Sequence, residues 1–266
     1  MIKQEHKNLV YYSFEIFEPF SPMSSTISTR LGGVSEGSFH SLNLALSVGD
    51  DQSAVITNRS RLYEAVGVES EAVAVAQLIQ GTYIEVVTDH SQGNGAQAFV
   101  GTDGLVTNIQ NRPLMILVAD CAAVTLFDPK RSVIALAHGG WRGTVGKIMQ
   151  KMVSTMNEAF GCDPADIFVG IGPSIGPCCY QVREDVINAF HTAFPQQAHH
   201  FFVPQEDDTV HLDMWTALRW QLQESGIRPN HIESADLCTA CHLDEFYSYR
   251  AEHGKTGRFA GLVVLR

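Results

Sequence analysis

The chain has 266 residues and a formal net charge of −11, because 29 acidic side chains outnumber 18 Lys and Arg. Its apolar fraction of 45% and charged fraction of 18% are those of a globular protein, which excludes a disordered chain. The acidic balance argues against a general nucleic-acid binder, which needs a basic surface. It does not exclude a small anionic substrate, since a few local arginines can hold one.

The hydropathy pattern indicates a cytoplasmic protein with no membrane partner. No apolar run reaches the ~18 residues of a membrane-spanning helix. The polar segment Met1 to Asn8 lacks the apolar stretch of a signal peptide. In the reducing cytoplasm the six cysteines are expected to be mostly thiols.

The first half of the chain predicts one helix and several short strands. A helix over Ser53 to Val66 follows the N-cap candidates Asp50-Asp51 and stops at Gly67. The glycine-rich stretch Ser91 to Gly101 is the best candidate for a mobile loop. The predicted strands are Val73 to Ala76, Tyr83 to Thr88, Leu114 to Ala119 and Val133 to Ala137.

The second half predicts three helices and three strands. The clearest helix, Thr144 to Phe160, repeats apolar residues at the helical period and is followed by Gly161. The other candidates are helices Glu184 to Phe194 and Met214 to Ser225, and strands Ile167 to Ile171, His231 to Ala235 and Phe259 to Leu265. Strands and helices alternate only loosely, which favours an α+β or mixed α/β fold with sheets covered by helices.

Polar residues follow two of the predicted strands directly. Asp120-Cys121 ends the first, and His138-Gly139-Gly140-Trp141-Arg142-Gly143 leads from the second into the long helix. A strand end is rigid enough to present a reactive side chain at a rim. Each residue also has a structural interpretation, since cysteine and tryptophan fill cores, aspartate caps turns and glycines turn the chain. The glycine-rich string does not match a phosphate loop, which ends in Gly-Lys-Ser/Thr.

These strings resemble the YfiH-type, or laccase-domain, family. Its members carry Ala-Asp-Cys and then a histidine, a small residue and Gly-Trp-Arg-Gly, as this chain does from Ala119 to Cys121 and from His138 to Gly143. Further matches occur in the family's order and span nearly the whole chain. They are Ser28-Thr29-Arg30 with Gly32-Gly33-Val34-Ser35, Ser41-Leu42-Asn43-Leu44, Asp103-Gly104-Leu105-Val106-Thr107, Ile171 to Gly176 with Cys178-Cys179-Tyr180, Ser248-Tyr249-Arg250, and Thr256-Gly257-Arg258.

The resemblance implies an α+β fold with layered α-β-β-α architecture and mixed sheets, in one domain over residues 1–266. It also implies a metal, usually zinc, held by two histidines and a cysteine. Cys121 and His138 match two of these ligands. The first family histidine stands in Gln-x-His-Gly, whereas this chain reads Gln77-Leu78-Ile79-Gln80-Gly81, so Gln80 takes the histidine's place.

Gln80 is an unusual residue at a zinc site. Zinc prefers thiolate and imidazole, and a neutral amide oxygen is a weak, hard ligand. Three interpretations stay open. Gln80 ligates through its carbonyl oxygen with lower affinity, another residue such as His90 substitutes for it, or the site has lost its metal and much of its activity.

The family is associated with purine nucleoside phosphorolysis, with methylthioadenosine cleavage and adenosine deamination as related activities. The resemblance therefore implies a nucleoside and phosphate as partners and a weakly held zinc as cofactor, with copper less expected. The candidate catalytic residues are Cys121, His138, Arg142 and Asp120. The candidate substrate-binding residues are Arg30, Asn43, Arg250 and Arg258, because guanidinium groups pair with oxyanions.

Rival functions use the same two residues differently. In a Cys/His hydrolase, such as a peptidoglycan-precursor editing enzyme, Cys121 is the nucleophile and His138 the base. A copper oxidase needs more ligands than one cysteine and one histidine. A degenerate, metal-poor binding protein is the third alternative. The oligomeric state is left open.

The remaining cysteine motifs are Cys238-x-x-Cys241 and the adjacent pair Cys178-Cys179. Cys238-x-x-Cys241-His242 suggests a second zinc site, but a lone Cys-x-x-Cys without a partner pair is weak evidence of one. The family has a Cys-Thr pair at Cys238-Thr239, so a structural role is favoured. Cys178-Cys179 are assigned to a packed turn.

Overall fold

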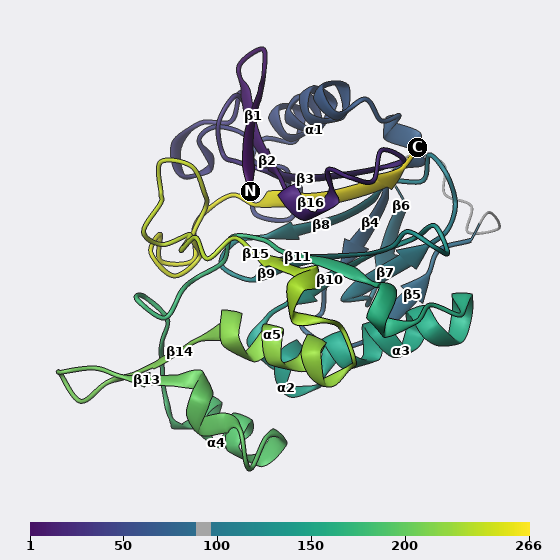
Figure 1. Ribbon diagram of the computed structural model, residues 1–266. Helices are drawn as coiled ribbons and strands as arrows, with labels where there is room; N and C mark the ends of the chain where they lie inside the picture. Colours follow the sequence, from purple (N-terminus) through teal and green to yellow (C-terminus); the bar gives the residue numbers. More distant parts are fainter. Residues whose placement is uncertain (89–96) are drawn as a thin grey trace.

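The computed structural model describes residues 1–88 and 97–266, in which two large sheets lie face to face (Figure 1). The first sheet has the strand order β1 (Ile2–His6), β2 (Leu9–Ser13), β3 (Met23–Ser28), β16 (Phe259–Leu265), β8 (Leu114–Val118), β4 (Ala74–Gln77) and β6 (Gln97–Val100). The second has the order β15 (Ile232–Ser234), β11 (Phe168–Ile171), β9 (Ala122–Asp128), β10 (Val133–Gly139), β7 (Gly104–Thr107) and β5 (Ile84–Val86). A small third sheet has the order β12 (Gln181–Val182), β14 (Val210–Leu212) and β13 (Phe202–Pro204).

Helices cover the outer faces of both large sheets (Figure 1). Helix α1 (Gln52–Val66) packs Leu62 and Tyr63 onto the first sheet. Helices α3 (Ile148–Phe160), α4 (Glu184–Ala193) and α5 (Met214–Glu224) contribute to the core beside the second sheet. A third core, which includes Ile116 and Leu136, joins the sheets to each other. The predicted α-β-β-α layering with mixed sheets is confirmed.

Burial on both faces explains the apolar run that predicted β10. Every residue of β9 and of β10 is buried, because one sheet face contacts the other sheet and the opposite face contacts the helices. A strand covered on both sides carries a continuous apolar run rather than an alternating pattern.

The predicted helix Thr144 to Phe160 is two helices in the structure. Helix α2 (Trp141–Val145) ends at Gly146, and α3 begins after Lys147, whose φ is 63°. A Cβ at Gly146 would lie 2.5 Å from Thr82 Cγ2. Only glycine lets the end of α2 approach the segment that follows Gln80 so closely, and the left-handed backbone of Lys147 separates α2 from α3.

Other differences concern strands whose sequences lack a clear period. Strand β9 was not predicted, although it pairs with β10 along its whole length, from Ala122 opposite Gly139 to Asp128 opposite Val133. The N-terminal strands and the small sheet were not predicted either. The prediction of a mobile loop over Ser91 to Gly101 was wrong for Gln97–Val100, which form β6. Residues 91–96 of that segment, together with His90, lie outside the described residues. Within the described part of the chain, no helix is long and apolar enough to cross a membrane.

Candidate active site

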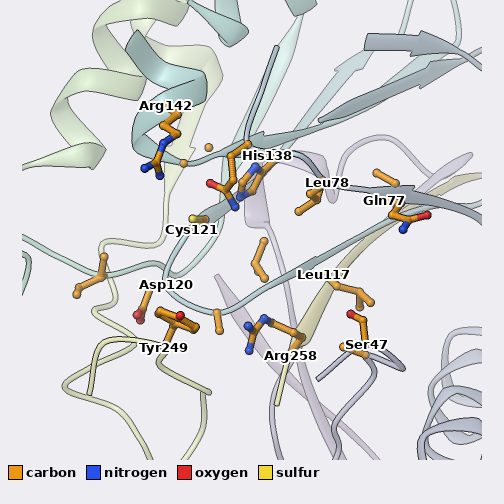
Figure 2. A pocket seen from close by; sticks show the side chains of 18 of the residues that line it. Ser47, Gln77, Leu78, Leu117, Asp120, Cys121, His138, Arg142, Tyr249 and Arg258 are labelled. Atoms are coloured by element: carbon orange, nitrogen blue, oxygen red, sulfur yellow. The ribbon is translucent and has the colours of Figure 1, made fainter. Parts of the chain in front are cut away.

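A cavity of about 900 Å³ is lined by residues of both large sheets (Figure 2). The first sheet contributes the ends of β4 and β8, and the second contributes the end of β10. Figure 2 shows Cys121 beside His138, with Arg142 on one side and Tyr249 and Arg258 across the cavity. The cavity is therefore assembled where several strand ends meet.

Strand register brings Cys121 and His138 together. Cys121 directly precedes β9, and His138 is the second-last residue of β10. Because β9 and β10 are antiparallel and His138 pairs with Ala123, the start of one strand lies beside the end of the other. His138 is buried, and Cys121 lies within hydrogen-bonding reach of its ring.

Gln80 completes this group. A Cβ at Gly140 would lie 3.1 Å from His138 Cε1, 3.2 Å from Cys121 Sγ and 3.2 Å from Gln80 Oε1. The three side chains therefore converge on a space that Gly140 keeps open. Gln80 itself has a φ of 62°, and its amide oxygen, not its backbone, faces this space.

The buried carboxylate of Asp103 positions both His138 and Gln80. Asp103 Oδ1 lies 3.0 Å from His138 Nδ1 and accepts from Gln80 N at 3.0 Å. Its Oδ2 accepts from Gly81 N at 2.7 Å and from Ile79 N at 3.4 Å. With Nδ1 engaged, the ring nitrogen of His138 that stays available is Nε2. A carboxylate behind a histidine is the usual arrangement at protein zinc sites.

The electrostatics of His138 reflect its two neighbours, Cys121 and Asp103. Burial alone would lower the pKa of His138, but Cys121 and the Asp103 carboxylate outweigh burial and raise the pKa to about 9. Burial likewise opposes ionisation of Asp103, yet its hydrogen bonds from His138 and Gly81 hold the pKa of that carboxyl below its usual value. The surroundings therefore favour positive charge next to Cys121.

Two of the three side chains that face the space beside Gly140, those of Cys121 and His138, are of the kind that zinc prefers. A thiol sulfur and an imidazole nitrogen are preferred zinc ligands, and the Gln80 amide oxygen is a weaker third. All three face the space beside Gly140. His90, the alternative third ligand, lies outside the described residues.

Four arginines line the cavity of this acidic protein: Arg59, Arg142, Arg250 and Arg258. Three of them are held by backbone carbonyl oxygens, namely of Leu44 for Arg59, of Gln181 for Arg250, and of Thr256 and Gly257 for Arg258. Arg142 stacks on the Trp141 ring, with its guanidinium carbon 4.3 Å from the ring centroid. A guanidinium has five N–H donors, so each group keeps donors for an anion.

Asp120 is the one carboxylate among the described residues that line the cavity. Its Oδ1 accepts from Thr239 Oγ1 at 2.7 Å, and its Oδ2 accepts from Arg250 N at 2.7 Å. Its backbone oxygen accepts from Ile175 N at 2.8 Å. Asp120 thus ties three loops together, and both of its carboxylate oxygens are engaged.

Arg30 and Asn43, which the resemblance put forward as substrate-binding residues, are not among the residues that line the cavity. Arg30 donates to the carbonyl oxygens of His40 and Leu243 and pairs with Glu252 at 3.2 Å. The amide of Asn43 is buried and is bound to Asp50 and to Arg258 N. Their motifs mark loop structure that supports the cavity wall from behind.

The sequence interpretation missed several residues of the site. Asp103 stood in a matched motif without an assigned role, and its contact with His138 spans 35 positions of sequence. Tyr180, next to Cys179, and Tyr249, next to Arg250, also line the cavity. Their places inside the matched strings were the only signal that pointed to them.

Comparison with known proteins identifies the family of the chain. Residues 24–266 match the family described as multi-copper polyphenol oxidoreductase laccase. The chain belongs to this laccase-domain family. Among laccase-domain relatives, the purine nucleoside phosphorylase YlmD of Geobacillus stearothermophilus is 36% identical over 252 residues, which cover 93% of this chain and 92% of the relative. The purine nucleoside phosphorylase of Bacteroides thetaiotaomicron is 32% identical and covers 95% of each chain.

Solved structures of laccase-domain proteins share the whole fold. The crystal structure of YlmD from Geobacillus stearothermophilus superimposes with a TM-score of 0.92 at 34% identity, over 99% of this chain and 98% of that one. The structure of the hypothetical protein YfiH from Bacillus licheniformis gives a TM-score of 0.91 at 33% identity, over 99% of each chain.

Proposed function

We propose that the protein is a zinc-dependent purine nucleoside phosphorylase that cleaves adenosine, inosine and methylthioadenosine with inorganic phosphate, and that it deaminates adenosine in the same cavity. The observation that carries this proposal is the meeting of four arginines with the donor atoms of Cys121 and His138 in one cavity of an acidic chain. Relatives that are 32% and 36% identical over most of their length are named purine nucleoside phosphorylases.

Phosphate would be held by Arg142, Arg250 and Arg258. All three line the cavity, and the backbone carbonyl oxygens bound to Arg250 and Arg258 limit the directions in which their free N–H groups point. Paired N–H groups of a guanidinium match the oxygens of a phosphate. The local positive charge opposes the repulsion that a net charge of −11 exerts on an anion.

The purine base would lie against aromatic rings. Tyr180, Tyr249 and Trp141 all line the cavity, and the flat ring of an aromatic side chain stacks on any nucleobase. A site that recognises the base mainly by stacking accepts both adenine and hypoxanthine, which is the substrate range proposed.

Phosphorolysis exchanges one bond for another at the ribose. A phosphate oxygen bonds to C1′ while the bond from C1′ to the purine nitrogen breaks. The bonding electrons leave with the base, which takes up a proton, and ribose 1-phosphate is the second product. The transition state is cation-like at the sugar, so the main task of the protein is to fix phosphate beside C1′.

Zinc would be held by Cys121, His138 and Gln80. When bound, it supplies a Lewis acid at the wall of the cavity. Asp103 fixes the ring of His138 by its contact with Nδ1, so that Nε2 faces the cavity. We place the enzyme in the cytoplasm, where reducing conditions keep Cys121 as a thiol.

The reaction is tested by product analysis with and without phosphate. Purified protein with added zinc should release adenine from adenosine and hypoxanthine from inosine, together with ribose 1-phosphate, only when phosphate is present. Arg142→Gln should raise the KM for phosphate, whereas Arg228→Gln, an exposed arginine that does not line the cavity, should not. Base release that needs no phosphate, or no turnover of any nucleoside, would contradict the proposal.

The weak ligand is tested by Gln80→His. Histidine is among the residues that tolerate a positive φ, and the variant replaces an amide oxygen by an imidazole nitrogen at the same place. We expect zinc to bind at least ten-fold more tightly than in the wild type. Zinc at this site is measured as the difference in bound zinc between each protein, wild type or Gln80→His, and the same protein that also carries Cys121→Ser. Equal affinity in both proteins would show that position 80 does not limit binding.

A second candidate function rests on the alignment of Cys121, His138 and Asp103. This is also the order of a nucleophile, its base and an orienting carboxylate, as in a Cys/His hydrolase. Such an enzyme would keep its activity in the presence of a chelator and would not need phosphate. The same product assay with and without a chelator therefore separates the two candidates.

A further inference from the structure

Four cysteines outside the cavity lining come together from two distant segments. Cys178 and Cys179 lie between β11 and β12, and Cys238 and Cys241 follow β15. All four Sγ atoms lie within 4.8 Å of one another. Among the described residues, this is the only group of three or more His, Cys, Asp or Glu side chains arranged so that they can hold a metal ion.

The sulfur spacing matches a metal-centred tetrahedron. Cys241 Sγ lies 3.5 Å from Cys178 Sγ and 3.4 Å from Cys179 Sγ. Zinc–sulfur bonds of ~2.3 Å at tetrahedral angles separate the sulfurs by about 3.8 Å. A disulfide requires about 2.0 Å, so all four residues are free thiols in the structure.

The backbone holds the two segments in place independently of the sulfurs. Ser174 N donates to Leu237 O at 3.2 Å, and Thr239 N donates to Ser174 O at 3.1 Å. The Cys-x-x-Cys turn is closed by Cys241 N, which donates to Cys238 O at 3.1 Å. A site whose ligands are already gathered by backbone bonds needs little rearrangement to bind an ion.

One sulfur also has a backbone donor. Gly176 N lies 3.2 Å from Cys238 Sγ, and Cys238 is buried. An N–H group aimed at sulfur stabilises a thiolate, which is the form that binds metal. The lone Cys-x-x-Cys of the sequence therefore has its partner pair in the adjacent cysteines of a separate loop.

We infer that Cys178, Cys179, Cys238 and Cys241 form a structural zinc site, separate from the one at Cys121 and His138. Four thiolates complete a tetrahedral shell and leave no open position for substrate, which is typical of structural zinc. The site would clamp the loop that leads into Tyr180 to the loop that carries Thr239, the partner of Asp120. The inference does not depend on the proposed reaction.

Metal content of matched variants tests the inference. Cys121→Ser removes the strongest ligand of the cavity site, so zinc that stays with this variant belongs elsewhere. We expect it to keep one equivalent of zinc after gel filtration, and Cys121→Ser combined with Cys241→Ser to keep none. Adding Cys162→Ala instead, at a buried cysteine outside both groups, should leave the one equivalent unchanged.

Cobalt supplies a second readout that does not depend on how well the double variant folds. Cys121→Ser loaded with Co²⁺ should show intense thiolate-to-cobalt charge-transfer absorption and tetrahedral d–d bands. The thiols of the four cysteines, protected by the bound metal, should react with a thiol reagent only after a chelator removes the metal. The inference would be overturned if Cys121→Ser bound no zinc and showed none of these bands with Co²⁺. It would also be overturned if the protein mass were two hydrogens below that of the fully reduced chain, which would reveal a disulfide among the four cysteines.

Discussion

Replacement of Asp103 by asparagine probes the hydrogen bonds that shape the site. The carboxylate accepts from three consecutive backbone N–H groups at residues 79–81 and contacts His138 Nδ1, and it is fully buried. In Asp103→Asn one acceptor oxygen becomes an NH₂ donor. If this NH₂ faces His138, the N–H of Gln80 loses its acceptor and Nδ1 must accept, which moves the ring proton to Nε2.

Both consequences can be given magnitudes. A buried donor without an acceptor costs about 1–3 kcal/mol, and the remaining bonds lose their charge assistance. We therefore expect the free energy of unfolding to fall by about 2–4 kcal/mol. A proton on Nε2 blocks the available nitrogen of His138, so zinc binding at Cys121 should weaken by about 10–100-fold, the usual effect of losing such a carboxylate.

Urea denaturation and competition with a chromophoric chelator measure the two effects. Asp128→Asn is a matched control, because Asp128 is also buried and accepts from the N–H groups of Lys130 and Arg131, away from the cavity. The control should keep its zinc affinity. Unchanged zinc affinity in Asp103→Asn would falsify the positioning role given to this carboxylate.

Three further changes test other parts of the structure. Gly140→Ala places a methyl group 3.1–3.2 Å from three site side chains, so zinc binding, measured by the same competition, should drop sharply while the overpacked fold loses only about 1–3 kcal/mol. Asn58→Ala removes a buried amide that donates to three oxygens and accepts from Val34 N; a fall of about 3–5 kcal/mol in the free energy of unfolding is expected, and a fall below 1 kcal/mol would contradict this role. Burial raises the pKa of the Cys162 thiol to about 12, so peptide mass spectrometry should find it unmodified after iodoacetamide treatment of native protein near neutral pH.

The motif strings were sufficient to find Cys121, His138 and the layered fold. Both residues follow short apolar runs of the kind that forms buried strands, and such a local pattern is visible in a sequence. The break between α2 and α3 was not visible, because the apolar period continues through Lys147, whose left-handed backbone no local pattern signals. Local helical period therefore predicted one continuous helix where the structure has two.

Long-range polar contacts explain the other differences. Arginine in a matched string has the same sequence signature whether or not it lines the cavity, so Arg30 and Arg142 could not be distinguished from the sequence. The roles of Asp103 and of the two cysteine pairs likewise depend on residues that lie 22 or more positions away. Spacing along one segment cannot reveal such partners.

The way in which position 80 is held has an evolutionary consequence. Asp103 binds the loop through backbone N–H groups alone, and these are the same whatever side chain the loop carries. Histidine and glutamine codons differ only at the third base. If Gln80 is the weak third ligand proposed above, a single nucleotide change at its codon would therefore alter metal affinity without disturbing the backbone that Asp103 holds.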